Sequence, residues 1–445
     1  MHRARRSRRI LGIVAGRSGD ARCRAAAGQP RRSSLGSLQA TLPKLGRPLM
    51  PRPPIARRIA EQMQASSWVR EMFERGLRLR AERGAENVFD FSLGNPNADP
   101  PEEFFMALRS VAAEREPALH RYMPNAGFPE ARAAVARFVA DEYGLDVDGS
   151  SVVLTTGAAG GLNVTMRALC EPGDEVIVLA PFFPEYRFYV EQAGATLVVV
   201  QTDDAFQPDI EALRAALTPR TRAIIVNSPN NPTGALYTDE NCRALARVMS
   251  ERDGDDNPLY LVLDDPYRRI VFDVDRAPSA AAYYARTILV SSYSKDLSIP
   301  GERAGYIAVP ATTPGRSQIL GALTMLNRTL GMVNLPAFMQ RVITRCASAC
   351  CDISRYRANR DRLCGALREM GYELPWPGGA MFAFPRTPID DLEFVELLMQ
   401  HNILVVPGRG FGRAGHMRIS FAVDPETIER ALPGFAAALE SPAVK

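Results

Sequence analysis

The feature that most constrains the fold is an alternation of short, apolar, β-branched runs with longer segments of helical periodicity, which continues from about residue 87 onward. Continuous apolar runs are typical of strands that are buried on both faces of a mainly parallel sheet. Seven strands are expected, at residues 151–155, 175–179, 196–200, 223–227, 260–264, 287–291 and 306–309. With helices such as 160–169 and 239–252 between the strands, the pattern predicts a doubly wound α/β fold.

Both ends of the chain are expected to form a smaller α+β domain. The pattern beyond about residue 334 predicts helices at 337–370, 392–400 and 425–440, and strands at 381–384, 403–406 and 417–421. The helical segment 55–83 is expected to pack on this part. The predicted boundaries are an extension at 1–50, an N-terminal segment of the small domain at 51–96, the large domain at 97–330 and the C-terminal small domain at 331–445.

The first fifty residues differ in composition from the rest of the chain. They contain eleven arginines and one lysine against one acidic residue, whereas the remainder holds 42 of the 54 basic and 49 of the 50 acidic residues. We expect this extension to be disordered, a targeting peptide, or sequence upstream of a true start at Met50. The mildly acidic remainder argues against nucleic-acid binding, and a cytoplasmic location is expected unless the extension directs the protein elsewhere.

Hydropathy and cysteine content argue against several other classes of protein. No stretch approaches the roughly 20 apolar residues that cross a bilayer. Seven cysteines in 445 residues do not suggest a secreted disulfide scaffold. Cys346, Cys350 and Cys351 lie close together in the sequence, but no second pair or histidine follows at zinc spacing. We therefore expect reduced cysteines on or near a helix, and no metal site.

The residues that follow the predicted strands are the candidates for a site, because ligands of open parallel sheets bind beyond the carboxyl ends of the strands. These residues are 156–161, 181–184, 228–234, 264–267 and 292–295, followed by Arg303. Each segment alone is also explained as a turn or a helix cap. Their combination is what points to a function.

Lysine usage singles out Lys295 among these candidates. The chain has 51 arginines but only three lysines, and Lys44 and Lys445 lie in the extension and at the last position. Arginine does not deprotonate in proteins, whereas a desolvated lysine can lose its proton and form a Schiff base. We therefore predict that Lys295 is a nucleophilic amine rather than a chance surface lysine.

A lysine nucleophile with these neighbours suits pyridoxal 5'-phosphate. This cofactor needs an amine for its aldehyde, a carboxylate for its ring nitrogen, donors to its ring oxygen, a face to stack on and a phosphate cradle. The residues expected to supply these are, in the same order, Lys295, Asp264, Asn231 with Tyr267, Phe183, and Ala158 and Ala159 with Arg303.

The combined motifs resemble those of fold-type I pyridoxal-phosphate enzymes, specifically the class I/II aminotransferases of the aspartate aminotransferase group. The motifs are Asn231-Pro232-Thr233-Gly234, Asp264-x-x-Tyr267, Ser292-x-Ser294-Lys295 and Arg303, and the likeness runs from about residue 91 to 421. The resemblance implies a seven-stranded cofactor domain with helices on both faces, a small domain built from both chain ends, and a homodimer.

The resemblance also implies roles for individual residues in cofactor binding. Lys295 would hold the internal aldimine and then shuttle a proton, and Asp264 would pair with the pyridinium nitrogen. Asn231 and Tyr267 would bind the phenolic oxygen. The phosphate would be bound by the backbone N–H groups of Ala158 and Ala159, the hydroxyls of Ser292 and Ser294, the Arg303 guanidinium and, across the dimer interface, Tyr122.

For the substrate, the resemblance implies that Arg418 grips the α-carboxylate and that Gly94, together with Asn231, lies against the amino acid. Gly94 can also be interpreted as a simple turn glycine. Arg328 lies near the position where dicarboxylate-specific relatives present an arginine from the partner subunit, although an interface or surface arginine is the favoured interpretation. Phe183 stands where aspartate aminotransferases usually carry tryptophan, which puts strict aspartate specificity in doubt.

The predicted function is amino-group transfer between an L-amino acid and a 2-oxo acid. Decarboxylation, elimination or oxidation of an amino acid are alternatives, because the cofactor supplies the electron-sink chemistry in every case. A non-catalytic, aminotransferase-like regulator is a remote alternative, since the residues before Pro51 lack the helical periodicity of a DNA-binding domain.

Overall fold

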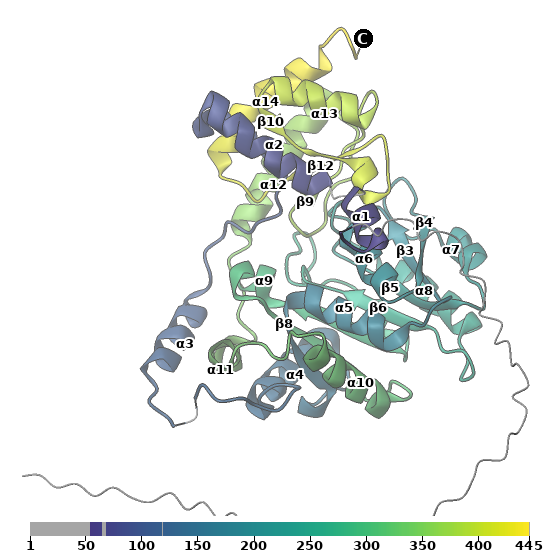
Figure 1. Cartoon of the computed structure of the whole chain (residues 1–445). Coiled ribbons are helices and arrows are strands. Elements are labelled where there is room, and N and C mark those ends of the chain that lie inside the picture. Colours follow the sequence, from purple (N-terminus) through teal and green to yellow (C-terminus); the bar gives the residue numbers. More distant parts are fainter. Residues whose placement is uncertain (1–53, 65–67, 118, 445) are drawn as a thin grey trace, which may run out of the picture. The chain divides into compact units, whose positions relative to one another are not determined.

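Seven strands form one central sheet in the computed structural model, which describes residues 54–64, 68–117 and 119–444 (Figure 1). The order is β2-β8-β7-β6-β5-β3-β4, and β8 alone runs antiparallel to its neighbours. The strands are β2 Val152–Thr156, β3 Glu175–Ala180, β4 Thr196–Gln201, β5 Thr221–Val226, β6 Tyr260–Asp264, β7 Thr287–Ser292 and β8 Ala304–Ala308. All seven predicted strands are confirmed, with ends that differ by at most two residues.

The continuous apolar character of these strands reflects two separate cores, one on each face of the sheet. In β3, Ile177 and Leu179 enter one core, whereas Val176 and Val178 enter the other. Because successive side chains of a strand point to opposite faces, both sets must be apolar when both faces are covered. The predicted doubly wound α/β fold is therefore present.

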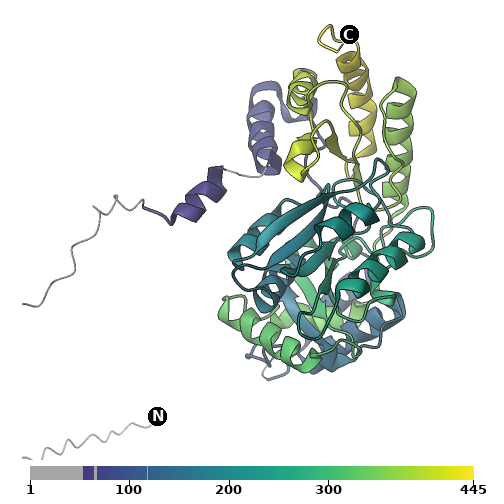
Figure 2. The same cartoon turned by 90° about the vertical axis from the view of Figure 1, so that its right-hand side faces the viewer.

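Helices cover both faces of the sheet (Figures 1 and 2). The first core contains residues from α3 Glu102–Ala113, α4 Pro129–Tyr143, α7 Ile210–Ala216, α8 Asp239–Arg252 and α11 Ala337–Cys346. The second core contains residues from α5 Gly157–Leu169, α6 Glu185–Gln192 and α10 Arg316–Thr329. The short helix α9 Tyr293–Asp296 follows β7 directly.

A smaller part of the molecule is built from both chain ends. Its strands are β1 Phe89–Asp90, β9 Phe382–Ala383, β10 Ile403–Leu404, β11 Val406–Pro407 and β12 Met417–Ser420, and its helices are α2 Trp68–Arg83, α12 Ser354–Met370, α13 Asp391–Gln400 and α14 Pro425–Leu439. Strand β1 pairs in parallel with β10, and β9, β11 and β12 form an antiparallel sheet. Met72 and Phe91 share one core with Leu363, Phe394 and Phe435, so the two ends fold together as expected.

The single helix predicted at 337–370 is wrong. Two helices, α11 and α12, are separated by residues 347–353. The Arg269 guanidinium donates hydrogen bonds to the carbonyls of Ser348 and Ala349 at 2.8 and 2.9 Å. These carbonyls therefore accept from a side chain and not from the backbone N–H groups of a continuous helix. Asp352 then accepts a hydrogen bond at 2.8 Å from the backbone N–H of Ser354, the first residue of α12.

The segment predicted to be helical at 55–83 contains α1 Arg57–Gln64 as well as α2, and residues 65–67 lie outside the described part. The expectations for the N-terminal extension at 1–50 fall outside the described residues. Among the described helices, none combines the length and the apolar character that a bilayer crossing requires. The domain boundaries given above remain a prediction.

Candidate active site

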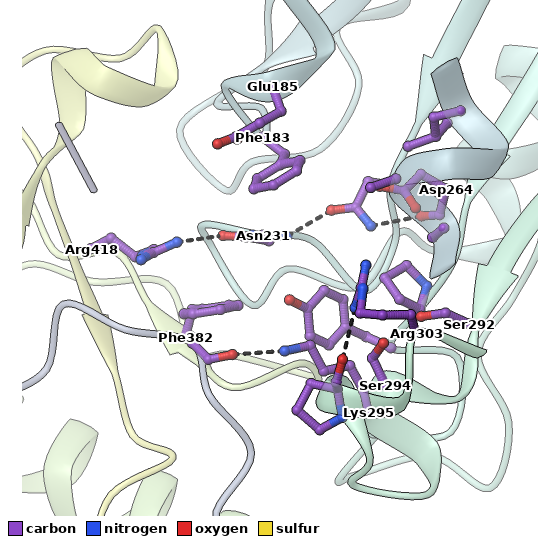
Figure 3. A pocket seen from close by; sticks show the side chains of 18 residues that line it. Phe183, Glu185, Asn231, Asp264, Ser292, Ser294, Lys295, Arg303, Phe382 and Arg418 are labelled. Carbon is purple, nitrogen blue, oxygen red and sulfur yellow. Dashed lines mark hydrogen bonds between the residues drawn. The ribbon is translucent and has the colours of Figure 1, made fainter. Parts of the chain in front are cut away.

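A pocket of about 280 Å³ lies beyond the carboxyl ends of the central strands (Figure 3). It is lined by Gly94, Ala158, Ala159, Leu162, Phe183, Glu185, Asn227, Asn231, Asp264, Pro266, Tyr267, Ser292, Ser294, Lys295, Pro300, Arg303, Phe382 and Arg418. The pocket therefore brings together every candidate site residue named from the sequence except Tyr122 and Arg328.

Lys295 enters the pocket from α9, immediately after β7. Its Nζ donates a hydrogen bond to the Gly94 carbonyl at 2.7 Å. Burial lowers the pKa of Lys295 to about 8, and the positive charges of Arg418 and Arg303 act in the same direction. A substantial fraction of this amine is therefore neutral near pH 8, as a nucleophilic lysine requires.

Asp264, the last residue of β6, presents a buried carboxylate with only one oxygen partnered. Its Oδ2 accepts a hydrogen bond from the Tyr186 hydroxyl at 2.5 Å, whereas Oδ1 has no hydrogen-bond partner among the described residues. Burial raises the pKa of Asp264 to about 7, and the hydrogen bond from Tyr186 opposes that rise. The carboxylate can thus accept one more N–H donor or cation.

The start of α5 and Arg303 form a cradle suited to an anion. The first N–H groups of a helix have no partner within the helix, and Ala158 and Ala159 bring that end of α5 to the pocket. Gly157 has a positive φ of 71°, and a Cβ atom there would lie 2.5 Å from an Arg303 guanidinium nitrogen. The glycine therefore allows the guanidinium to approach the helix closely.

Arg418 forms the opposite end of the pocket from the small antiparallel sheet. Its side chain is buried, and it donates hydrogen bonds to Asn231 Oδ1 at 3.0 Å and to the Ser92 carbonyl at 2.5 Å. The guanidinium carbon lies 4.7 Å from the Phe382 ring centroid. Burial lowers the pKa of Arg418 to about 10, so the group stays cationic at neutral pH and can bind a carboxylate.

A chain of amide hydrogen bonds connects the two ends of the pocket. The Asn231 backbone N–H donates to Asn227 Oδ1 at 2.8 Å, and Asn227 Nδ2 donates to the Asp264 carbonyl at 2.7 Å. The Asn231 side chain thereby keeps a fixed position between Arg418 and Asp264.

Close packing against the Phe382 ring requires a glycine at position 94. A Cβ atom at this position would lie 2.4 Å from the Phe382 ring, well inside van der Waals contact. The alternative interpretation as a plain turn residue is therefore insufficient, because close approach to an aromatic wall of the pocket already requires a glycine.

Sequence reasoning missed three polar or aromatic residues of the pocket wall, Asn227, Phe382 and Glu185, and it also missed Tyr186, which donates to Asp264 without lining the pocket. Tyr186 lies on α6 and packs edge to face against the Phe183 ring at a centroid distance of 5.7 Å, but no motif marked it. Asn227 was predicted to be the last residue of a strand and was therefore given no role in the site. The strand ends at Val226, so Asn227 is the first residue beyond it. Phe382 and Glu185 gave no motif signal.

Tyr122, which is expected to act from a second subunit, and Arg328, for which such a role was the less favoured interpretation, do not line the pocket of their own chain. The Tyr122 side chain is 95% exposed, and Arg328 is an exposed residue of α10. Their proposed roles need a second copy of the chain and stay predictions.

The cysteine cluster holds no metal-ligand arrangement. Cys346 ends α11, and Cys350 and Cys351 lie between α11 and α12. Within the described residues all cysteines are free thiols, and no group of three or more histidine, cysteine or acidic side chains is placed to hold a metal ion.

Comparison with known proteins assigns the chain to a family. Residues 86–435 match the model of the aminotransferase class I and II family. A probable aspartate/prephenate aminotransferase of Thermus aquaticus is 34% identical over 374 residues, which cover 82% of this chain and 94% of the relative. The aspartate/prephenate aminotransferase of Thermus thermophilus is also 34% identical, over 81% of this chain and 93% of the relative.

Solved structures agree with the sequence relatives. An amino transferase from Eubacterium rectale superposes with a TM-score of 0.84 at 36% identity, covering 87% of this chain and 99% of that protein. The aspartate aminotransferase of Thermus thermophilus with maleate gives a TM-score of 0.77 at 30% identity, covering 87% of this chain and all of that protein. The chain is a fold-type I protein and belongs to the class I and II aminotransferase family, whose members transfer amino groups with pyridoxal phosphate.

Proposed function

We propose that this protein moves an amino group between an L-amino acid and a 2-oxo acid, with pyridoxal phosphate held in the pocket by Lys295. One observation carries the proposal: Lys295, with its lowered pKa, shares a pocket with a half-partnered Asp264 and an anion cradle. These groups match the amine, ring-nitrogen and phosphate requirements of the cofactor.

The residues of the pocket fit this cofactor in detail. The Asp264 Oδ1, buried and without a partner among the described residues, is available to a protonated ring nitrogen. Tyr267 and Asn231 are available to the phenolic oxygen, and Phe183 to the ring face. The helix start at Ala158 and Ala159, together with Ser292, Ser294 and Arg303, would hold the phosphate.

Bound pyridoxal phosphate withdraws electrons from the α-carbon of an attached amino acid. The protein would supply orientation and proton transfer. Arg418 would bind the α-carboxylate through its planar fork, which lysine cannot reproduce. The neutral amine of Lys295 would then accept the proton from the α-carbon at Nζ, because its lowered pKa leaves it free to act as a base.

The proposal includes a homodimer in which Tyr122 of one chain reaches the phosphate site of the other. The near-complete exposure of Tyr122 supports this part, since such a side chain is free to contact a second copy. A cytoplasmic location is part of the same proposal.

The test is a single half-reaction with the holoenzyme and one amino acid. Amino-group transfer predicts stoichiometric formation of the 2-oxo acid together with pyridoxamine phosphate. Release of carbon dioxide or ammonia without pyridoxamine phosphate would assign the protein to another reaction of the same cofactor. The holoenzyme incubated without amino acid is the control.

A further inference from the structure

The pocket wall carries one more charged group than the proposed reaction uses. Its cations are Lys295, Arg303 and Arg418, and the proposed function assigns them to the cofactor amine site, the phosphate and the α-carboxylate. Its anions are Asp264, assigned to the ring nitrogen, and Glu185, which has no role so far. Glu185 therefore remains to act on the rest of the substrate.

Glu185 begins α6 and lies beside Phe183. Figure 3 shows its side chain on the Phe183 side of the pocket, with the carboxyl group toward the end that Arg418 occupies. Its Oε2 is buried and has no hydrogen-bond partner among the described residues. A buried carboxylate oxygen without a partner is costly, so this oxygen is available to a donor on a ligand.

Glu185 and Arg418 influence each other across the pocket without forming an ion pair. Burial raises the pKa of Glu185, and a hydrogen bond from its own backbone and then the charge of Arg418 oppose that rise. The charge of Glu185 in turn opposes the lowering of the pKa of Arg418 by burial. Both side chains line the same pocket, so the carboxylate belongs to the wall that a substrate held by Arg418 would face.

We propose that Glu185 determines specificity by selecting amino acids whose side chain carries no negative charge, and by favouring side chains that donate a hydrogen bond. The inference rests on the proposed function. With the α-carboxylate on Arg418, a second carboxylate would find every cation of this chain's described pocket wall already engaged. It would meet the unpaired oxygen of Glu185, and like charges repel strongly where they are partly buried. A hydroxyl, amide or ammonium group would instead supply the missing donor.

Direct binding of unreactive carboxylates tests the proposal on the full-length holoenzyme. Maleate is a dicarboxylate probe and 3-phenylpropionate a monocarboxylate probe, and titration calorimetry gives both dissociation constants. In Glu185→Gln, the affinity for maleate relative to 3-phenylpropionate should rise by about tenfold, equivalent to about 1.4 kcal/mol. Glu185→Ser removes the same charge and should move the ratio in the same direction. The matched control is Glu130→Gln, because Glu130 also follows a proline at a helix start but is exposed on α4.

An isosteric pair of substrates, L-glutamine and L-glutamate, provides the second measurement. The wild-type protein should have the higher kcat/KM with glutamine, and Glu185→Gln should reduce that preference by about tenfold. A ratio in both Glu185 variants within twofold of the wild-type ratio, for probes and substrates alike, would overturn the inference. A wild-type preference for maleate and glutamate would also overturn it, and loss of that preference in Arg328→Ala would identify the cation responsible. If the probes behave as expected but no amino acid yields a 2-oxo acid, the selectivity stands and the proposed function fails.

Discussion

The two ends of the pocket are built in different ways. At one end, Asp264 and Ser292 end two neighbouring strands of a single sheet, and Lys295 follows the second of these strands. At the other end, Arg418 of β12 is held by the carbonyl of Ser92, 326 positions away in the sequence. The first end depends on the register of one sheet, whereas the second depends on how the small part of the molecule packs on the large one.

The two ends also differ in how close their charges are to titrating. Burial brings Lys295 and Asp264 to pKa values of about 8 and about 7, near neutrality. Arg418 keeps a pKa of about 10 and remains charged. We call the end with Lys295 and Asp264 the chemical end, because the protonation states of these groups can change during a reaction. We call the end with Arg418 the binding end, because its charge stays constant.

The largest expected effect is at the chemical end. Lys295→Ala should lower kcat by at least about a thousandfold, because the proposed base and nucleophile are lost together. Pyridoxal phosphate should still bind, since Asp264 and the phosphate cradle do not depend on the amine. Steady-state kinetics and cofactor titration measure the two effects. Lys295→Arg should be equally inactive, and Lys44→Ala is the control that should keep full activity.

The next effect isolates the binding end. Arg418→Ala should raise the KM for amino acids by about a hundredfold, because a charge-assisted, bidentate contact with the α-carboxylate is lost. Arg418→Lys should recover only part of this affinity. The dissociation constant of the cofactor should change by less than about twofold, which would separate the two ends experimentally. Arg413→Ala, at a half-buried arginine that pairs with Asp204 and does not line the pocket, is the control. Equal losses of cofactor and substrate affinity would contradict the separation.

A smaller effect is expected at the support of the chemical end. Tyr186→Phe removes the hydroxyl that donates to Asp264 Oδ2. Without this hydrogen bond the pKa of Asp264 should rise further, so a smaller fraction would be ionised at neutral pH and available to a ring nitrogen. Cofactor affinity should weaken by about tenfold. Tyr189→Phe on the same helix is the control. Unchanged cofactor affinity in Tyr186→Phe would show that the Tyr186 hydroxyl does not support Asp264 in cofactor binding.

The smallest effect is a pH dependence at Lys295. Because its pKa is lowered to about 8, the neutral amine becomes the major form above that pH. The rate of pyridoxal phosphate uptake by the apoprotein should therefore rise by about fivefold from pH 7 to pH 8 and level off near pH 9. A rate that keeps rising to pH 10, as expected for an ordinary lysine, would show that burial does not lower the pKa of Lys295.

The sequence predicted the chemical end more completely than the binding end. Strand ends are visible as apolar runs followed by polar residues, and Lys295 stood out because arginine replaces lysine elsewhere in the body. Phe382 and Glu185 reach the pocket through tertiary packing, which no local pattern encodes. Arg418 was found only through its resemblance to a family motif.

The fold follows the same division. The seven strands were predicted because each is buried on both faces, so local composition reflects tertiary position. The break between α11 and α12 was missed because its cause is remote: Arg269 binds the carbonyls of Ser348 and Ala349. Periodicity alone cannot reveal a side chain that competes for backbone carbonyls from 79 positions away.

The central claim is that Lys295 is the amine that holds the cofactor, and borohydride reduction of the holoenzyme tests it most directly. Reduction followed by proteolysis and mass spectrometry should find the pyridoxyl group on the peptide that contains Lys295, and on neither Lys44 nor Lys445. Labelling at another lysine alone, or no labelling of a protein that nevertheless turns over amino acids, would contradict the account.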